Sequence, residues 1–137
     1  MADNTQIIKR SYKAFLENDF DTLLELYHPE SVWTFTNWED FVEKQVYEGH
    51  EGVREVLQMM QGDIGIIRNS FAEIVELDEN RLFIEGRTTM RGATSGIEIE
   101  MPPFGQIIEF RDGLIVRVDN YSDVETCRSA AGLPASP

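Results

Sequence analysis

The stretch that decides the fold is residues 105–123, Gly-Gln-Ile-Ile-Glu-Phe-Arg-Asp-Gly-Leu-Ile-Val-Arg-Val-Asp-Asn-Tyr-Ser-Asp. Two runs suited to β-strands flank Asp112-Gly113, and an Asp-Gly pair between such runs is typical of a tight hairpin. Both faces of each run carry apolar residues, which predicts a hairpin in the middle of a sheet with cover on both sides. Its polar residues, among them Gln106 and Asn120, are therefore expected to contribute to any site.

Size and composition favour one globular domain with a small-molecule or protein partner. The 137 residues are 42% hydrophobic and 27% charged, and suffice for one hydrophobic core. The net charge of -13 argues against nucleic acid and anionic membranes as partners, because both attract basic surfaces. No apolar run approaches the roughly 20 residues of a membrane span. The lone Cys127 and the absence of a secretion-signal pattern favour a cytoplasmic location.

The first part of the chain is expected to be largely helical. Asp3 or Asn4 can cap a helix that ends near Asn18, and Asp19 or Asp21 can cap a shorter one through Tyr27. His28-Pro29-Glu30 should end that helix, because proline disfavours helical geometry in the preceding residue. Residues 31–37 then favour a strand. Residues 38–47 suggest a short amphipathic helix that either covers a cavity or packs against the core, and a helix over 53–60 follows a loop at 48–52.

The second part is expected to be a sheet. Strands are predicted at 69–77, 81–91, 96–110 and 114–121, with a break at 62–65. Met101-Pro102-Pro103 should kink the third strand, since proline cannot donate a hydrogen bond within a sheet. A closing helix spans 123–131. This order predicts a single α+β domain over residues 1–132, followed by a disordered tail at 133–137.

The chain resembles the SnoaL-like branch of the nuclear transport factor two superfamily, which includes ketosteroid isomerase and limonene epoxide hydrolase. The resemblance covers nearly the whole chain and rests on several local motifs: Asp19-Phe20-Asp21, Leu26-Tyr27-His28-Pro29-Glu30, Gly49-His50-Glu51-Gly52-Val53-Arg54, Arg91-Gly92, Arg111-Asp112-Gly113-Leu114-Ile115-Val116-Arg117 and Ala130-Ala131-Gly132-Leu133. It implies a cone-shaped α+β barrel, with a curved antiparallel sheet wrapped around the N-terminal helices and an apolar cavity between them.

The resemblance also implies a homodimer that forms through the outer face of the sheet. On this interpretation the outer face carries Ile97, Ile99, Ile107 and Ile115. An apolar surface of that size is usually covered by a partner, and a two-fold pair of such faces would cover it.

The ketosteroid isomerase site is only partly present. By resemblance, Tyr12 lies near the tyrosine of its oxyanion hole and Gln106 near its acid. The aspartate base is replaced by Phe35, which cannot take a proton, so this activity is not expected.

The limonene epoxide hydrolase site is also largely missing. Trp33 and Phe35 replace the residues that hold its water, and Thr89 replaces the aspartate that pairs with the retained Arg87. Asn120 stands near the position of the other aspartate, beside Asp119, which alternation turns to the opposite face.

A polyketide cyclase of this branch would need one acid in the pocket, and the candidates are Glu85, Glu98, Glu100 and Asp119. Each of them is also explained as a solvated strand residue or as a partner in the dimer interface. His28 and His50 fit capping and turn roles. No metal site is predicted, because no set of ligands has suitable spacing.

The predicted pocket combines apolar walls with a few hydrogen-bonding groups, the usual composition of a small-molecule site. Its predicted lining is Tyr12, Phe15, Trp33, Phe35, Trp38, Met60, Arg87, Phe104, Gln106, Val118 and Asn120. The alternative is that large side chains, chiefly Trp33 and Phe35, fill the cone.

Two functions fit the predicted pocket. One is a cofactor-independent enzyme or binder for a small hydrophobic, ring-containing molecule, and the other is a non-catalytic dimeric module that binds a ligand or a protein. An inward Arg87 would pair with the ligand or with Glu85, whereas an outward Arg87 would lie in solvent or in the dimer interface.

Overall fold

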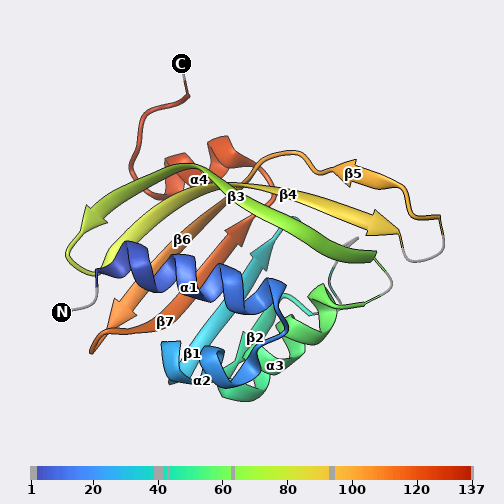
Figure 1. Ribbon diagram of the computed structural model, residues 1–137. Helices are drawn as coiled ribbons and strands as arrows, with labels where there is room; N and C mark the ends of the chain where they lie inside the picture. The colour runs from blue at the N-terminus through green and yellow to red at the C-terminus, as the bar shows by residue number, and fades with distance from the viewer. Residues whose placement is uncertain (1–2, 39–41, 43, 63, 93–94, 137) are drawn as a thin grey trace.

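One curved sheet of seven strands, with helices on both of its faces, forms the described part of the computed structural model (Figure 1). The structure describes residues 3–38, 42, 44–62, 64–92 and 95–136. The helices are α1 (Asn4–Leu16), α2 (Phe20–Leu26), α3 (Gly49–Met60) and α4 (Val124–Ala130). The strands are β1 (Tyr27–Thr36), β2 (Val46–Glu48), β3 (Ile64–Asp78), β4 (Arg81–Gly92), β5 (Glu98–Glu100), β6 (Phe104–Arg111) and β7 (Leu114–Tyr121).

The predicted hairpin is present as β6 and β7. Arg111 pairs with Leu114, which leaves Asp112 and Gly113 as a two-residue turn. Their φ angles are 55° and 77°, and a tight turn of this kind needs positive φ at both central residues. Asparagine, aspartate and glycine adopt positive φ most readily, so the Asp-Gly pair sets the position of this hairpin.

The sheet runs in the order β2-β1-β7-β6-β4-β3, and β5 pairs with the far end of β4. The α+β class and the curved sheet around N-terminal helices are confirmed, although the sheet stays open rather than closing into a barrel. All strand pairs are antiparallel except β1 with β7, which is parallel. Figure 1 shows α1 across the hollow of the sheet and α4 on its opposite face.

Aspartate side chains begin three of the helices as predicted. Asp3 accepts a hydrogen bond from the amide of Thr5 at the start of α1, and Asp19 accepts one from the amide of Thr22 in α2. Asp123 does the same for Glu125 in α4. Each bond satisfies a backbone N–H that has no partner within the helix, which is why these positions favour aspartate.

Several boundaries differ from the prediction because distant segments decide them. β1 begins at Tyr27, where it meets Ile115 of β7, and β3 begins at Ile64, which pairs with Gly92. The predicted loop at 48–52 is instead split between β2 and the first turn of α3. Gly52 lets the first turn of α3 lie close against β2, since a Cβ at this position would be 2.7 Å from the backbone of Tyr47. The predicted helix at 38–47 is wrong at its end, where β2 begins, and residues 39–41 and 43 lie outside the described residues.

The predicted outer face is wrong for Ile115, and the predicted exposure is wrong for Ile107 as well. The register between β6 and β7 shifts where Glu109 pairs with Arg117 and Phe110 with Ile115. Val116 is thereby an extra residue in β7, so that Ile115 turns inward and is fully buried in the main core. Ile107 does face outward, but α4 covers it. There it is buried against Phe83 of β4 and Cys127 of α4. Ile97 and Ile99 are 61% and 55% exposed, as expected.

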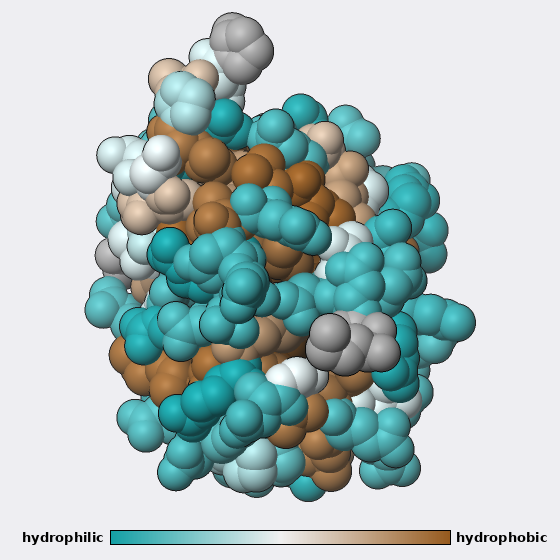
Figure 2. Space-filling model, turned by 90° about the vertical axis from the view of Figure 1, so that its left-hand side faces the viewer, coloured by the Kyte–Doolittle hydropathy of each residue, from teal (hydrophilic) through white to brown (hydrophobic). Residues whose placement is uncertain are grey.

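The C-terminal helix and the residues after it cover a second, smaller apolar cluster on the outer side of the sheet. Phe83, Ile107 and Cys127 form its buried centre, and Leu133 packs against it. Arg128 connects α4 to β3 and to the residues after the helix. Its guanidinium donates hydrogen bonds to Glu73 Oε1 of β3 and to the carbonyl of Pro134, both at 2.6 Å. Figure 2 shows hydrophobic surface directly below the projecting C-terminal segment.

No helix within the described residues is both long enough and apolar enough to cross a membrane.

Candidate functional site

A pocket of about 450 Å³ lies between the hollow face of the sheet and helices α1 and α3. Side chains from α1, from the end of α3 and from five strands line it, together with residues from the segments before β2 and before β6. Figure 1 shows α1 crossing the hollow face of the curved sheet, and the residues that line the pocket come from this face and from the helices that cover it. Pockets of this size accommodate small organic molecules.

The pocket brings together ten of the eleven residues predicted to line it. They come from elements far apart in the sequence and are Tyr12, Phe15, Trp33, Phe35, Trp38, Met60, Phe104, Gln106, Val118 and Asn120. Alternation accounts for the strand residues: Trp33 and Phe35 share one face of β1, and the parallel register sets them beside Val118 and Asn120 of β7.

Aromatic rings form one wall of the pocket. Trp33 stacks on Phe35 with ring centroids 6.0 Å apart, and Phe15 meets Trp33 edge-on at 5.5 Å. Trp38 lies edge-on to both Phe35 and Phe104, at 6.3 Å from each. Such a wall offers flat apolar surface and ring edges, which suit the faces of an aromatic or alicyclic ligand.

A chain of hydrogen bonds crosses the other side of the pocket. The hydroxyl of Tyr12 donates to Gln106 Oε1 at 2.5 Å, and Gln106 Nε2 donates to Asn120 Oδ1 at 2.6 Å. Asn120 Nδ2 in turn donates to the backbone carbonyl of Thr34 at 3.0 Å. Gln106 and Asn120 are 5% and 3% exposed, so these bonds satisfy polar groups that water reaches poorly.

Burial keeps the two tyrosines of the pocket protonated. It raises the pKa of Tyr12 far above the ordinary value, and the nearby Tyr27 adds to the rise. Burial also raises the pKa of Tyr27, although the hydrogen bond between its hydroxyl and Ser11 Oγ opposes the rise. Both phenols are therefore neutral at physiological pH.

Arg87 is a correction to the predicted pocket. Its side chain is 58% exposed and lies 3.5 Å from Glu85 Oε2 on the outer side of β4. Alternation along β4 turns Leu82, Ile84 and Thr88 inward, so the odd-numbered residues of this stretch, Arg87 among them, face outward.

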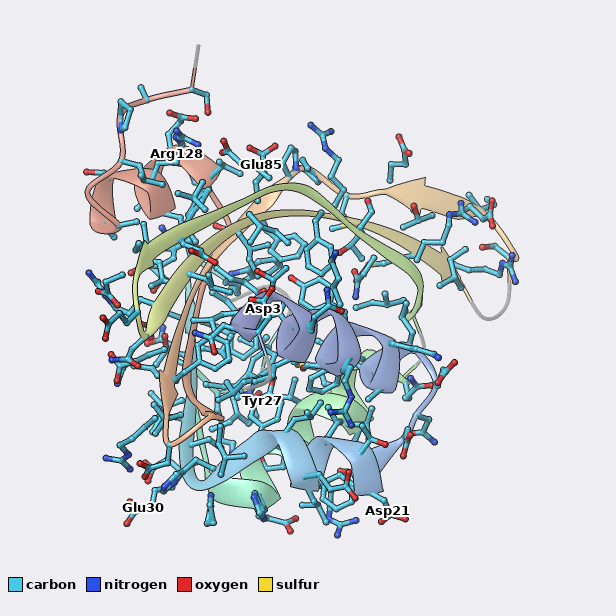
Figure 3. All side chains as sticks on the ribbon, turned by 60° about the vertical axis from the view of Figure 1, so that its left-hand side comes forward. Asp3, Asp21, Tyr27, Glu30, Glu85 and Arg128 are labelled. Carbon is cyan, nitrogen blue, oxygen red and sulfur yellow. The ribbon has the colours of Figure 1, made fainter. Side chains whose placement is uncertain are left out.

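No ionisable acid or base other than the two tyrosines lines the pocket among the described residues. The acids considered for a cyclase lie elsewhere. Figure 3 shows Glu85 beyond the outer side of the arch formed by β3 and β4, whereas Tyr27 lies in the interior. Glu98 and Glu100 are exposed. Asp119 faces away from the pocket, where it accepts hydrogen bonds from Thr34 and Arg117.

Sequence reasoning missed several residues that line the pocket. Asn69 and Thr88 face each other across β3 and β4, and the hydroxyl of Thr88 donates to Asn69 Oδ1 at 2.7 Å. Ser11 of α1 and Tyr27 of β1 contribute two hydroxyl groups that are hydrogen-bonded to each other. The inward turn of Thr88 follows from alternation once β4 has its correct face, but no local signal in the sequence identifies that face.

The histidines and the other possible ligands do not form a second site in the described structure. His50 Nε2 bonds to the carbonyl of Tyr27 at 2.9 Å, and His28 Nδ1 accepts from the amide of Glu30 at 3.0 Å. Within the described residues, no three His, Cys, Asp or Glu side chains gather to hold a metal ion.

Solved structures of similar fold come from several kinds of protein. TerC, crystallised with polyporic acid, is 21% identical, with a TM-score of 0.74 over 94% of this chain and 98% of TerC. An NTF2-like protein from Burkholderia pseudomallei K96243 is 20% identical, with a TM-score of 0.72 over 94% and 97%. An LEH-like epoxide hydrolase from Mycobacterium tuberculosis is 18% identical, with a TM-score of 0.66 over 92% and 82%. At these identities the likeness establishes the fold alone.

No curated protein matches the chain significantly in sequence. The sequence model of the SnoaL-like domain family matches residues 8–118, which include α1 from its fifth residue onward, the aromatic strand β1 and most of the pocket. The chain therefore belongs to the SnoaL-like domain family.

Proposed function

We propose that this protein binds a small, neutral, hydrophobic molecule containing one or more rings in the pocket, without a cofactor. The observation that carries the proposal is the composition of the pocket lining. Aromatic and aliphatic side chains surround the neutral hydrogen-bonded chain of Tyr12, Gln106 and Asn120, and the described lining contains no ionised group.

The neutrality of the ligand follows from the cost of burying charge. An anion in this pocket would lose its water without gaining an arginine, lysine or histidine from the described lining. A cation would equally gain no carboxylate from the described lining. A neutral ring compound instead gains from burial of its apolar surface and from contact with the rings of Trp33, Phe35 and Trp38.

Relatives support binding of ring compounds by this fold. TerC was crystallised with polyporic acid, and other proteins of the same fold include an LEH-like epoxide hydrolase. For this chain we propose binding rather than turnover, because isomerisation, aldol cyclisation and epoxide hydrolysis all need a positioned base. By resemblance Phe35 stands at the base position of ketosteroid isomerase, and it lines the pocket without any group that could take a proton.

We further propose that the protein is a cytoplasmic homodimer, as the resemblance and the sequence features suggest. The apolar surface available for this is smaller than predicted. Ile97, just before β5, and Ile99, within β5, are exposed. Ile107 and Ile115 are instead buried within the protomer. Sedimentation velocity at micromolar concentration in 0.15 M salt tests the dimer, and a monomer under these conditions would contradict it.

Titration with the neutral fluorescent probe N-phenyl-1-naphthylamine tests the binding function. The probe should gain fluorescence in the pocket of the unmodified protein. Val118→Phe should reduce its affinity, because the larger side chain occupies pocket volume. Val46→Phe, at a position that is 46% exposed and outside the pocket lining, is the matched control and should bind as before. Absence of probe binding, or equal binding by both variants, would refute the proposal.

A further inference from the structure

The hydrogen-bonded chain in the pocket has a single possible direction. It ends on the carbonyl oxygen of Thr34, which can only accept a hydrogen bond. The atom of Asn120 that lies 3.0 Å from this oxygen must therefore be the amide nitrogen, and the oxygen of Asn120 must face Gln106. The usual ambiguity between oxygen and nitrogen in a side-chain amide is thereby resolved by its neighbours.

The same reasoning extends from Asn120 to Tyr12. Because Asn120 presents Oδ1, Gln106 must present Nε2 to it at 2.6 Å, and Gln106 Oε1 then faces Tyr12 at 2.5 Å. The only proton available for that contact is the one on the Tyr12 hydroxyl. Tyr12 therefore gives its single proton to Gln106 and presents only lone pairs to a ligand.

The donors and acceptors that these three side chains leave unused are complementary to a hydroxyl group. Tyr12 can accept a further hydrogen bond at its oxygen, while Gln106 and Asn120 each keep one amide N–H without an acceptor among the described residues. A ligand hydroxyl can donate to Tyr12 and accept from an amide. A carbonyl or ether can only accept, and an ionised oxygen would face the lone pairs of Tyr12 in a pocket whose described lining offers no cation in compensation.

We propose that this pocket recognises a hydroxyl group on a neutral ring compound, with Tyr12 as the hydrogen-bond acceptor, rather than a carbonyl or an anion. The inference rests on the proposed function, since it concerns the same pocket. It also assigns Tyr12 a role opposite to that of a tyrosine in an oxyanion hole, which donates its proton to the ligand.

Displacement of N-phenyl-1-naphthylamine by four probes of one shape tests this inference at pH 7. The probes are 2-naphthol, which is neutral and has a donor, 2-methoxynaphthalene and 2-acetylnaphthalene, which only accept, and the anion 2-naphthoate. We expect 2-naphthol to bind about fivefold more tightly than each of the others, the effect of one net hydrogen bond. The comparison is stringent because the methoxy probe has more apolar surface.

Two variants separate the role of Tyr12 from general effects on the pocket. Tyr12→Phe removes the acceptor, so the preference for 2-naphthol over 2-methoxynaphthalene should disappear. Gln106→Met removes the group that holds the proton of Tyr12, so the phenol becomes free to donate and 2-acetylnaphthalene should gain about fivefold relative to 2-naphthol. Tyr47→Phe is the matched control, because Tyr47 is a buried tyrosine outside the pocket lining, and it should keep the original preference.

The possible outcomes distinguish this inference from the proposed function. If all four probes bind equally, or if the ketone binds best to the unmodified protein, the inference is wrong while the binding function stands. If the anion binds best, the inference and the proposed neutrality of the ligand are both wrong. If N-phenyl-1-naphthylamine itself does not bind, both are wrong. Should Tyr12→Phe fail to fold, the preference of the unmodified protein and its inversion in Gln106→Met decide the question.

Discussion

Replacement of Gln106 by glutamate tests the direction of the hydrogen-bonded chain without any ligand. A protonated carboxyl group reproduces the glutamine: its carbonyl oxygen accepts from Tyr12 and its O–H donates to Asn120. An ionised carboxylate has no proton to donate, so it would face Asn120 Oδ1 with two acceptors in contact. The position is only 5% exposed, and water cannot compensate for the lost bond.

The introduced carboxyl group should therefore have a raised pKa in the folded protein. In the unfolded chain a glutamate titrates near pH 4.3, so above that pH the folded state holds a proton that the unfolded state has released. The free energy of unfolding then falls as pH rises, by about 1.4 kcal/mol per pH unit, until pH passes the folded pKa. If the folded pKa exceeds 7, the variant loses about 2.7 kcal/mol between pH 5 and pH 7, because the interval covers two units.

Urea unfolding followed by tryptophan fluorescence at pH 5, 6 and 7 measures this loss. The difference between Gln106→Glu and the unmodified protein removes the contribution of the native titratable groups. Gln58→Glu introduces the same charge at an exposed position of α3 and should show no such slope. If the two variants depend on pH alike, Gln106 does not act as both donor and acceptor in a dry chain, and the polarity assigned to Tyr12 loses its basis.

The remaining predictions concern the outer side of the sheet. Gly105→Ala should destabilise the protein by about 1–3 kcal/mol in urea unfolding, because the new Cβ would lie 2.4 Å from the Cβ of Cys127. Gly65→Ala, where nothing lies within 4 Å, should cost little. Burial raises the pKa of the Cys127 thiol to about 12, so iodoacetamide at pH 8 should label it only after unfolding, as mass spectrometry would show. Arg87→Met should change stability by less than about 1 kcal/mol and leave probe binding intact, since the Arg87 side chain is 58% exposed and lies 3.5 Å from Glu85 outside the pocket. Loss of probe binding in this variant would show that Arg87 does contribute to the pocket.

Local chemistry in the sequence was sufficient to predict most of the elements. Asp112-Gly113 identifies its own hairpin because few other residues tolerate positive φ at both turn positions. Asp3, Asp19 and Asp123 mark helix starts because their side chains satisfy nearby amides. These signals act over a few residues, so they can be recognised without knowing the fold.

The sequence also indicated which residues share a face, because alternation and helical spacing are properties of each element alone. Together with the family resemblance, this led to a predicted lining in which Gln106 and Asn120 from neighbouring strands accompany Tyr12 from α1. The order of their hydrogen bonds required the structure, since it depends on the carbonyl of Thr34, which is 86 residues from Asn120 in the chain.

Only the tertiary structure decided which face of each strand points inward. Arg87 and Thr88 are neighbours in β4, and the choice between them depends on the pairing of β4 with β3 and β6 rather than on either residue. A single bulge at Val116 of β7, opposite Glu109 and Phe110, likewise turns Ile115 into the core. A shift of one residue reverses the face of every side chain beyond it, and the long-range pairing that sets such shifts leaves no local mark in the sequence.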